Sequence, residues 1–531
     1  MSLTLEQEVG QQFLLSFTGK RKPPSELLEI LKRQHLGGIV LFRAKNMGSL
    51  AELRALTAAL QKTASQSGQP PLLIAADQEG GQLMAIGDAT PFPGNMALGA
   101  TGSEKLAYRV GKALGREVAA VGVNVDFAPV CDVNNNPANP VVGTRSFGEN
   151  PGLVARLGAA LIRGLQSAGV AATAKHFPGH GDTASDSHHG APVLPHDPKR
   201  VHRVELPPFR AAIEAGVRLM MTAHIVFPAL NGGTSLPATL SEDILRGLLR
   251  RKLGFDGLIV SDAMDMHAIG QGPGLVVDAL AALGAGVDLL LLNHELARLA
   301  SVYSCAIQAA HRGLLSRQEI HASARRILKL KAWVARSKQP PLSVIGCREH
   351  HALAREVAEK SVTLVRDTAG LLPLNLQPNA KIAVVVPRPE DLTPADTSSL
   401  VMPALASAAR RYHRQVDDFT IAMNPSVAEI KALRAKLVKY DLLILGTINA
   451  ASHPGQADLV NTMRKNGSKA ITVALRMPYD LAAYPAAPTY VCTYSILPPA
   501  MEALAGALWG RIPFQGKLPV SIPTKHLSQA G

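Results

Sequence analysis

Eight short apolar segments recur along the first 300 residues, and the stretches between them have the periodicity of helices. Two of these stretches, SLAELRALTAALQKTA and LVARLGAALIRGLQSAG, carry apolar residues at three- and four-residue spacing. Strands that alternate with helices pair in parallel, because a parallel neighbour is reached only through a long connection. The strands are expected at FLLSF from residue 13, LGGIVLF from 36, PLLIAAD from 71, VNVDFAP from 123, VAATAKH from 170, RLMMTAH from 218, DGLIVSD from 256 and VDLLLLN from 287. Eight such units predict a closed (β/α)₈ barrel.

Polar side chains stand at the carboxyl ends of five of these predicted strands. They are Asp77, Asp132, Lys175 with His176, His224 and Asp262, in chain order. A barrel gathers these strand ends on one face, where the following loops build the active site. One such residue is often structural, but five strands that share this feature predict a catalytic rim.

The fifth strand runs into a polar segment, KHFPGHGDTASDSHHG, from Lys175 to Gly190. It is too polar to bury and too rich in glycine to be a helix, which predicts a reactive loop. Asp186 and His188 lie two residues apart, so their side chains can point the same way and the carboxylate can fix the imidazole tautomer. A histidine paired in this way can deliver and recover a proton near neutral pH. We therefore predict a general acid/base dyad.

Asp262 ends the seventh apolar strand and is expected to be held rigidly. An ionised aspartate can attack an acetal carbon and form a covalent intermediate, provided that an acid protonates the leaving oxygen. The dyad and Asp262 together predict a double displacement. Lys175 is expected to bind a substrate hydroxyl, with pairing to a rim carboxylate as the alternative.

The histidines also permit a metal site, because His176, His180, His188, His189 and His224 could supply nitrogen ligands. The chain has no HExxH spacing, and histidines flanked by glycine seldom hold a closed coordination geometry. We therefore expect no metal, and loop-shaping roles for His180 and His189.

A second domain is expected after the barrel, which we assign to residues 1–338. The segment SKQPPLSVIG has paired prolines and no periodicity, so residues 339–370 are predicted to be a linker with a connecting helix. Residues 371–531 are predicted to form a smaller α/β sandwich domain. Its strands are expected at KIAVVVP from residue 381, VDDFTIA from 416, DLLILGT from 441, AITVALR from 470 and TYVCTYS from 489.

The chain is basic, with 55 Lys and Arg against 41 Asp and Glu and a formal net charge of +14. Part of this charge lies on one predicted helix that carries Arg312, Arg317, Arg325, Arg326, Lys329, Lys331, Arg336 and Lys338. We interpret this group as a solvated helix face, with attraction to anionic polymers as the alternative. We expect no nucleic-acid partner, although a non-catalytic protein that binds carbohydrate or polyanions remains a remote alternative.

The four cysteines form no CxxC pair, which argues against a zinc site and a disulfide framework. The first residues lack a basic segment followed by an apolar one, and no apolar run is long enough to cross a bilayer. A cytoplasmic protein without an integral membrane segment is therefore expected. The oligomeric state stays open, with a monomer as the expectation.

Five segments resemble glycoside hydrolase family 3, and the Asp-Ser-His end of the polar loop is similar to that of bacterial β-N-acetylglucosaminidases of this family. The segments are DQEGG at 77, FAPVCDVNNNP at 127, TRSFG at 144, KHFPGHGDTASDSHH at 175 and SDAMDM at 261. The resemblance implies retaining removal of terminal β-linked N-acetylglucosamine from oligosaccharides or muropeptides, without metal or organic cofactor. It implies Asp262 as the nucleophile, His188 as the acid/base and Asp186 as its partner. It implies sugar-binding positions at Asp77, Arg145, Lys175 and His176.

One position departs from the family pattern, because Gln82 follows DQEGG where the family usually has arginine. This difference is expected to remove a fixed charge near the sugar pocket. Two further reaction types stay open: a β-N-acetylglucosaminide phosphorylase, since a histidine repels phosphate less than a glutamate would, and another β-glycosidase of the same family.

Overall fold

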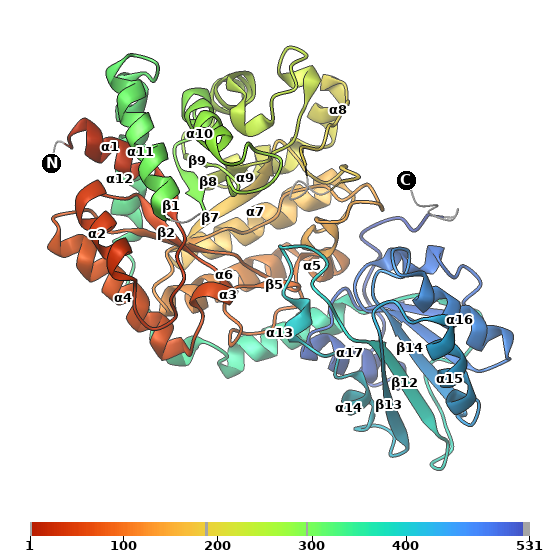
Figure 1. The fold of residues 1–531 in the computed structure, drawn as a ribbon. Helices are drawn as coiled ribbons and strands as arrows, with labels where there is room; N and C mark the ends of the chain where they lie inside the picture. Colours follow the sequence, from red (N-terminus) through yellow and green to blue (C-terminus); the bar gives the residue numbers. More distant parts are fainter. Residues whose placement is uncertain (1–2, 186–189, 294–295, 524–531) are drawn as a thin grey trace.

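The first part of the chain forms a parallel eight-stranded barrel (Figure 1). The structure is a computed structural model and describes residues 3–185, 190–293 and 296–523. The barrel strands are β1 (Phe13–Leu15), β2 (Gly38–Leu41), β3 (Leu73–Ala76), β6 (Val125–Asp126), β7 (Ala171–Phe177), β8 (Leu219–Thr222), β9 (Leu258–Val260) and β10 (Leu290–Leu292). The sheet order is β10-β1-β2-β3-β6-β7-β8-β9, and a parallel bridge between Val260 and Leu289 joins its two ends. The predicted (β/α)₈ barrel is confirmed.

Helices surround this barrel and alternate with its strands. They are α1 (Leu5–Gln11), α2 (Ser25–Gln34), α3 (Arg43–Asn46), α4 (Leu50–Gln66), α5 (Asn95–Thr101), α6 (Glu104–Ala120), α7 (Pro151–Ser167), α8 (Pro198–Arg203), α9 (Pro207–Glu214), α10 (Pro273–Ala285), α11 (Leu296–His311) and α12 (Arg317–Val334). A π-helical segment, η4 (Asp243–Lys252), takes the corresponding place between β8 and β9. The sequence fixes several helix starts locally. Helix α4, for example, begins with a capping box between Ser49 and Glu52.

The barrel interior is filled by alternate residues of the strands. Leu14, Val40, Leu73, Val125, Met221, Val260 and Leu291 belong to one buried cluster, to which α12 adds Ile327, Leu330 and Val334. Side chains on the opposite strand faces pack against the helices. The inward and outward rows are both apolar, because a strand of such a barrel is covered on both sides.

A second sheet of six strands follows the barrel (Figure 1, blue and cyan). Its strands are β11 (Thr363–Asp367), β12 (Ile382–Pro387), β13 (Val416–Ile421), β14 (Leu442–Thr447), β15 (Ala470–Ala474) and β16 (Thr489–Cys492), in the order β11-β16-β15-β14-β12-β13. All neighbours are parallel except β11, which pairs antiparallel with β16. The helices are α14 (Leu405–Ala409), α15 (Val427–Leu437), α16 (Pro454–Lys465) and α17 (Pro498–Leu508). The predicted α/β character is confirmed.

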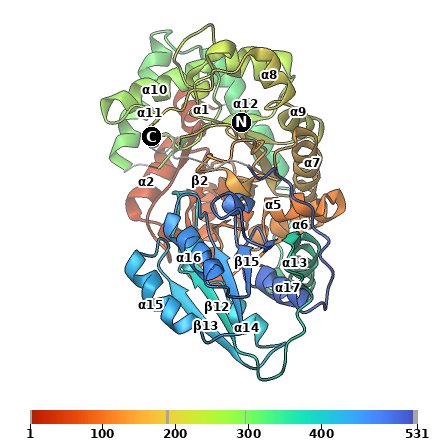
Figure 2. The same ribbon diagram turned by 90° about the vertical axis from the view of Figure 1, so that its right-hand side faces the viewer.

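Helix α13 (Arg348–Ser361) joins the two parts and packs on both (Figure 2). It contacts α5 and α6 on the barrel and α17 in the second part. Strand β11 follows it directly, so the stretch predicted as a linker supplies a packed helix and an edge strand. The exact boundaries at 338 and 370 stay predictions.

The basic cluster differs from the expectation of one solvated helix. Arg312 lies in the turn between α11 and α12, and Arg336 and Lys338 follow the end of α12. Lys331 is buried, with its ammonium donating to Gln11 Oε1 at 2.7 Å and to the Leu36 carbonyl at 3.3 Å. Arg326 binds Asp288, an ion pair that lies inside the barrel wall. Two of the eight charges therefore serve internal contacts. Within the described ranges, no helix combines the length and apolar character that a bilayer crossing requires.

Candidate functional site

A cavity of about 980 Å³ opens at the carboxyl ends of the barrel strands. Five side chains that the sequence predicted for the site line it: Asp77, Arg145, Lys175, His176 and Asp262. They come from the ends of three different strands and from the short helix η1 (Gly143–Arg145). Asp186 and His188, the predicted dyad, lie outside the described residues. The roles of all seven residues stay predictions.

A two-stranded hairpin after β3 brings a further carboxylate into the site. Strands β4 (Gln78–Gly80) and β5 (Leu83–Met84) form it. Gly80 ends β4 and Gly81 begins the turn, with φ angles of 78° and 64°. Residues with a Cβ rarely adopt such angles, which explains the paired glycines of DQEGG. The hairpin places the Glu79 side chain, only 1% exposed, beside Arg145.

Glu79 is the centre of a buried ion network. Its carboxylate accepts two hydrogen bonds from Arg145, at 2.9 Å and 2.8 Å, and forms an ion pair with Lys175 Nζ at 2.7 Å. Lys175 Nζ also donates to Asp77 Oδ1 at 2.7 Å. Burial opposes the charge on Glu79, but Arg145 and Lys175 outweigh it and lower its pKa to about 2. The network therefore holds Lys175 and Asp77 at fixed positions on the pocket floor.

Lys175 contacts the carboxylates of Asp77 and Glu79. Pairing with a carboxylate and binding of a substrate hydroxyl, the two roles expected for it, do not exclude each other. Burial disfavours its ammonium, yet Asp77 and Glu79 raise its pKa above the ordinary value. It therefore stays charged and can still donate to a ligand. Asp126, buried at the end of β6, behaves in the opposite way, because burial and its neighbours Asp77 and Glu79 raise the pKa of this carboxyl well above normal.

Asp132 organises the backbone that leaves β7. Its carboxylate lies 2.7 Å from His176 Nδ1 and accepts hydrogen bonds from the backbone N–H of His176 at 3.2 Å and of His180 at 2.7 Å. Burial raises the pKa of Asp132, but the two histidines outweigh it and leave the pKa below its usual value. Burial, together with the charge of His176, lowers the pKa of His180 to about 4, so its imidazole is neutral at pH 7.

Asp262 follows β9 by two residues and lines the same cavity. Its Oδ1 accepts the backbone N–H of Ala263 at 2.8 Å. His224 supports the same turn, because its Nε2 contacts the Ala263 carbonyl at 3.1 Å and its Nδ1 lies 2.8 Å from Thr239 Oγ1. The predicted strand-end residue His224 thus fixes the backbone next to Asp262. In the described part of the chain, no histidine that we considered as a metal ligand belongs to a group of three such ligands.

The second domain supplies one wall of the pocket. Residues 391–400 bring Asp391, Asp396, Thr397 and Leu400 to its edge. Gln82 anchors this wall, since its carbonyl accepts both the N–H and the hydroxyl of Thr397, each at 2.8 Å. Its side chain donates to the Ala395 carbonyl at 3.3 Å, and its Oε1 accepts a hydrogen bond from Arg476.

The expected effect of Gln82 on the charge near the sugar pocket stays a prediction. Arg476 of the second domain brings its guanidinium to the Gln82 side chain. Its ion-pair partner Asp396 lies 2.8 Å away, with both side chains buried. The glutamine accommodates an arginine that comes from a distant part of the chain.

Comparisons with known proteins agree with this geometry. The model of the glycosyl hydrolase family 3 N-terminal domain matches residues 4–330. A beta-hexosaminidase A from Pseudoalteromonas piscicida is 32% identical over 98% of this chain and 97% of its own length. The chain belongs to glycoside hydrolase family 3. It is a glycoside hydrolase with a barrel and a smaller α/β domain, as the motifs predicted.

Solved structures of family 3 share the whole two-domain arrangement. A β-N-acetylglucosaminidase from Paenibacillus sp. str. FPU-7 superposes with a TM-score of 0.93 at 38% identity, covering 99% of this chain and 100% of that one. A beta-glucoside phosphorylase superposes with a TM-score of 0.81 at 25% identity, over 98% of this chain and 94% of that one.

Sequence reasoning missed Glu79 and Asp126 as parts of the site. Glu79 stands inside a motif that we quoted, and its isolation between polar and glycine residues was the available signal. Asp126 precedes a phenylalanine within an apolar strand and gave no such signal. Its hydrogen bond comes from the hairpin that follows β3, because Gln78, the first residue of β4, donates its N–H to Asp126 Oδ1 at 3.0 Å.

Proposed function

We propose that this enzyme is a retaining exo-β-N-acetylglucosaminidase that removes terminal, non-reducing β-linked N-acetylglucosamine. One observation carries the proposal: Asp262 shares a pocket with the Asp77–Lys175–Glu79–Arg145 network, in a chain whose full length resembles a β-N-acetylglucosaminidase. The floor of the pocket is buried and the rim is exposed, which suits one terminal sugar inside and the rest of the substrate outside.

The proposed reaction has two steps. In the first, the Asp262 carboxylate attacks the anomeric carbon while an acid protonates the glycosidic oxygen, so that the aglycone leaves as an alcohol. In the second, the group that acted as the acid now acts as a base and removes a proton from water. This water attacks the anomeric carbon, and the bond between the sugar and Asp262 breaks. Asp77 and Lys175 would bind sugar hydroxyls from the pocket floor, with Arg145 and His176 beside them.

We assign the acid/base role to His188, paired with Asp186. The support is the two-residue spacing in the loop after β7 and the resemblance to bacterial family members. We infer that substrates include peptidoglycan fragments such as muropeptides. No metal or organic cofactor takes part in the proposed steps, and a cytoplasmic location stays a prediction.

Trapping with a fluorinated N-acetylglucosamine analogue tests the proposal. Mass spectrometry of the intact protein and of its peptides should reveal one sugar attached to Asp262. An adduct on another residue, or none while the substrate is turned over, would remove Asp262 from the nucleophile role.

His188→Ala provides the second test. It should slow cleavage of an N-acetylglucosamine disaccharide far more than cleavage of an aryl glycoside whose leaving group needs no proton. Equal slowing of both substrates would contradict the acid role. The same assay with phosphate present separates hydrolysis from phosphorolysis, since only a phosphorylase would form a sugar 1-phosphate.

A further inference from the structure

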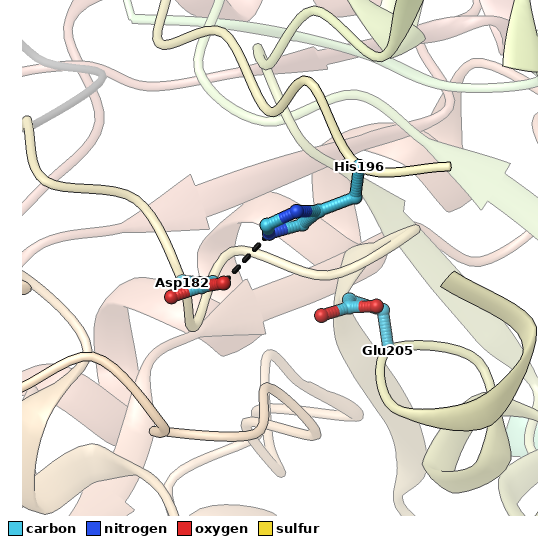
Figure 3. Close-up of side chains that lie close together, drawn as sticks. All are labelled: Asp182, His196 and Glu205. Atoms are coloured by element: carbon cyan, nitrogen blue, oxygen red, sulfur yellow. Dashed lines mark hydrogen bonds and ion pairs between the residues drawn. The ribbon is translucent and has the colours of Figure 1, made fainter. Parts of the chain in front are cut away.

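Four ionisable side chains form a cluster outside the pocket, on the loop that follows β7, on α8 and on the turn after α8. Figure 3 shows three of them, Asp182, His196 and Glu205, which approach one another from separate segments. His196 Nε2 lies 2.6 Å from Asp182 Oδ2. Arg200, the fourth member, donates to the same Asp182 oxygen at 2.9 Å and lies 3.5 Å from Glu205 Oε1. We call these four residues the loop clamp.

The clamp joins Asp182 and His196, which lie on either side of the segment 183–195 in the sequence. Residues 183–185 follow Asp182 and residues 190–195 lead to His196, and the predicted dyad Asp186–His188 lies between them in the sequence, outside the described residues. The 2.6 Å contact between Asp182 and His196 ties the two ends of this segment together. Tying the ends of a loop reduces the conformations open to its interior, which is a requirement for a catalytic group that must meet a substrate at a fixed distance.

The first end is also attached to the pocket wall. The Asp132 carboxylate binds the N–H of His180, and Asn139 Nδ2 donates to the His180 carbonyl at 2.9 Å. Asn136 Nδ2 donates to the Asp182 carbonyl at 3.1 Å. Asp182 is thereby held in register with the backbone that carries His176 into the pocket.

The second end is attached to the loop after β8. Leu194 N–H donates to the Val226 carbonyl at 2.9 Å, and Val226 N–H donates to the Pro192 carbonyl at 2.8 Å. Both ends therefore have backbone anchors, but these anchors belong to different parts of the barrel. The contact between Asp182 and His196 links them directly.

Arg200 places a positive charge between the carboxylates of Asp182 and Glu205. The Glu205 side chain is 3% exposed, and neither of its oxygens has a hydrogen bond, although Arg200 lies within ion-pair distance. Burial accordingly raises the pKa of Glu205, with Arg200 acting in the opposite direction. An aspartate, a histidine and a glutamate whose ligand atoms lie within 4.8 Å of one another could also take a metal ion. Here a guanidinium already contacts both carboxylates.

We propose that Asp182, His196 and Arg200 are positioning residues for the acid/base step: they fix the ends of segment 183–195 and so set where the dyad meets the glycosidic oxygen. This inference rests on the proposed function, because it needs the acid to lie in that segment. It predicts that loosening the clamp impairs proton donation while leaving the nucleophile and sugar binding intact.

Asp182→Asn and His196→Gln test this, each measured on an N-acetylglucosamine disaccharide and on an aryl glycoside with an activated leaving group. Misplacement of the acid should lower kcat for the disaccharide by about 10- to 100-fold, with KM unchanged. The aryl glycoside should lose less than about threefold, because its departure needs no proton. Equal effects on both substrates, or no effect on either, would overturn the inference.

Glu117→Gln is the matched control for a merely structural effect. Glu117 is buried away from the pocket and lies 2.6 Å from His350 Nδ1, the same distance as in the clamp. This variant should lose stability without changing the ratio of the two rates. If it changes the ratio as much as Asp182→Asn does, the clamp has no special role and the inference fails.

Two further arms separate the possible failures. If His188→Ala shows no dependence on the leaving group, the proposed function itself is wrong. If His188→Ala shows it and the clamp variants do not, only the present inference fails. Treatment with EDTA, followed by Zn²⁺, should leave both rates of the unmodified enzyme unchanged. A loss with EDTA that Zn²⁺ restores would show that a metal, and not Arg200, links the two carboxylates.

Discussion

Glu79→Gln removes the negative charge between Arg145 and Lys175 while keeping the shape of the side chain. The drop in the pKa of Glu79 from 4.5 to about 2 corresponds to about 3 kcal/mol of stabilisation at neutral pH. Breaking a buried ion pair on one side costs about 3–5 kcal/mol, which agrees with this magnitude. Over a barrel of roughly 330 residues, about 2.1 cal/mol/K of unfolding entropy per residue converts 3 kcal/mol into a fall in Tm of about 4 °C.

The direction of the pKa shift of Glu79 decides how the effect of this substitution on stability changes with pH. A carboxyl whose folded pKa is depressed stabilises the protein above its unfolded pKa of 4.5, and the stabilisation is lost as the pH falls toward 2. The difference in unfolding free energy between the native enzyme and Glu79→Gln should therefore be about 3 kcal/mol at pH 6 and about half of that at pH 3. Urea unfolding at the two pH values measures it.

Activity should fall together with stability in this variant. Without Glu79, Lys175 and Arg145 lose the group that holds them on the pocket floor, so kcat/KM should fall at least about 10-fold. Glu117→Gln, which lies outside the pocket, should lower Tm without this loss. The reasoning is refuted if Glu79→Gln matches the native enzyme in unfolding free energy at pH 6, or if its stability deficit does not shrink at pH 3.

Two further changes test contacts far from the catalytic groups. Burial lowers the pKa of Lys331 from 10.5 to about 7, and the unfolded chain keeps this proton to higher pH, so stability should rise between about pH 7 and pH 10.5. Lys331→Met should flatten this rise in urea unfolding, and an unchanged rise would contradict the assignment. Arg476→Ala leaves Asp396 buried without its cation and should destabilise the second domain by about 3 kcal/mol. Faster proteolysis of residues 391–400 would report the loosened pocket wall, and an unchanged cleavage rate and unfolding midpoint would count against the anchor.

The barrel and its catalytic rim follow from local patterns. Apolar strands that alternate with amphipathic helices can pair only in parallel, and parallel pairing brings all strand ends to one face. Asp77, Lys175 and Asp262 could therefore be predicted as neighbours without knowledge of any contact between them. The same argument predicted the second sheet, although not its edge strand β11. The antiparallel pairing of β11 depends on the position at which helix α13 ends.

The sequence by itself determined the strand–helix alternation, the polar strand ends and the spacing of Asp186 and His188, because each is a property of neighbouring residues. Tertiary structure alone decided that Glu79 links Arg145 to Lys175, that Arg476 reaches Gln82 across 394 positions, and that Asp182 meets His196. These contacts join residues that are far apart in the sequence, so no local periodic pattern of residues indicates them. Their geometry exists only once the barrel has closed and the second domain has packed against it.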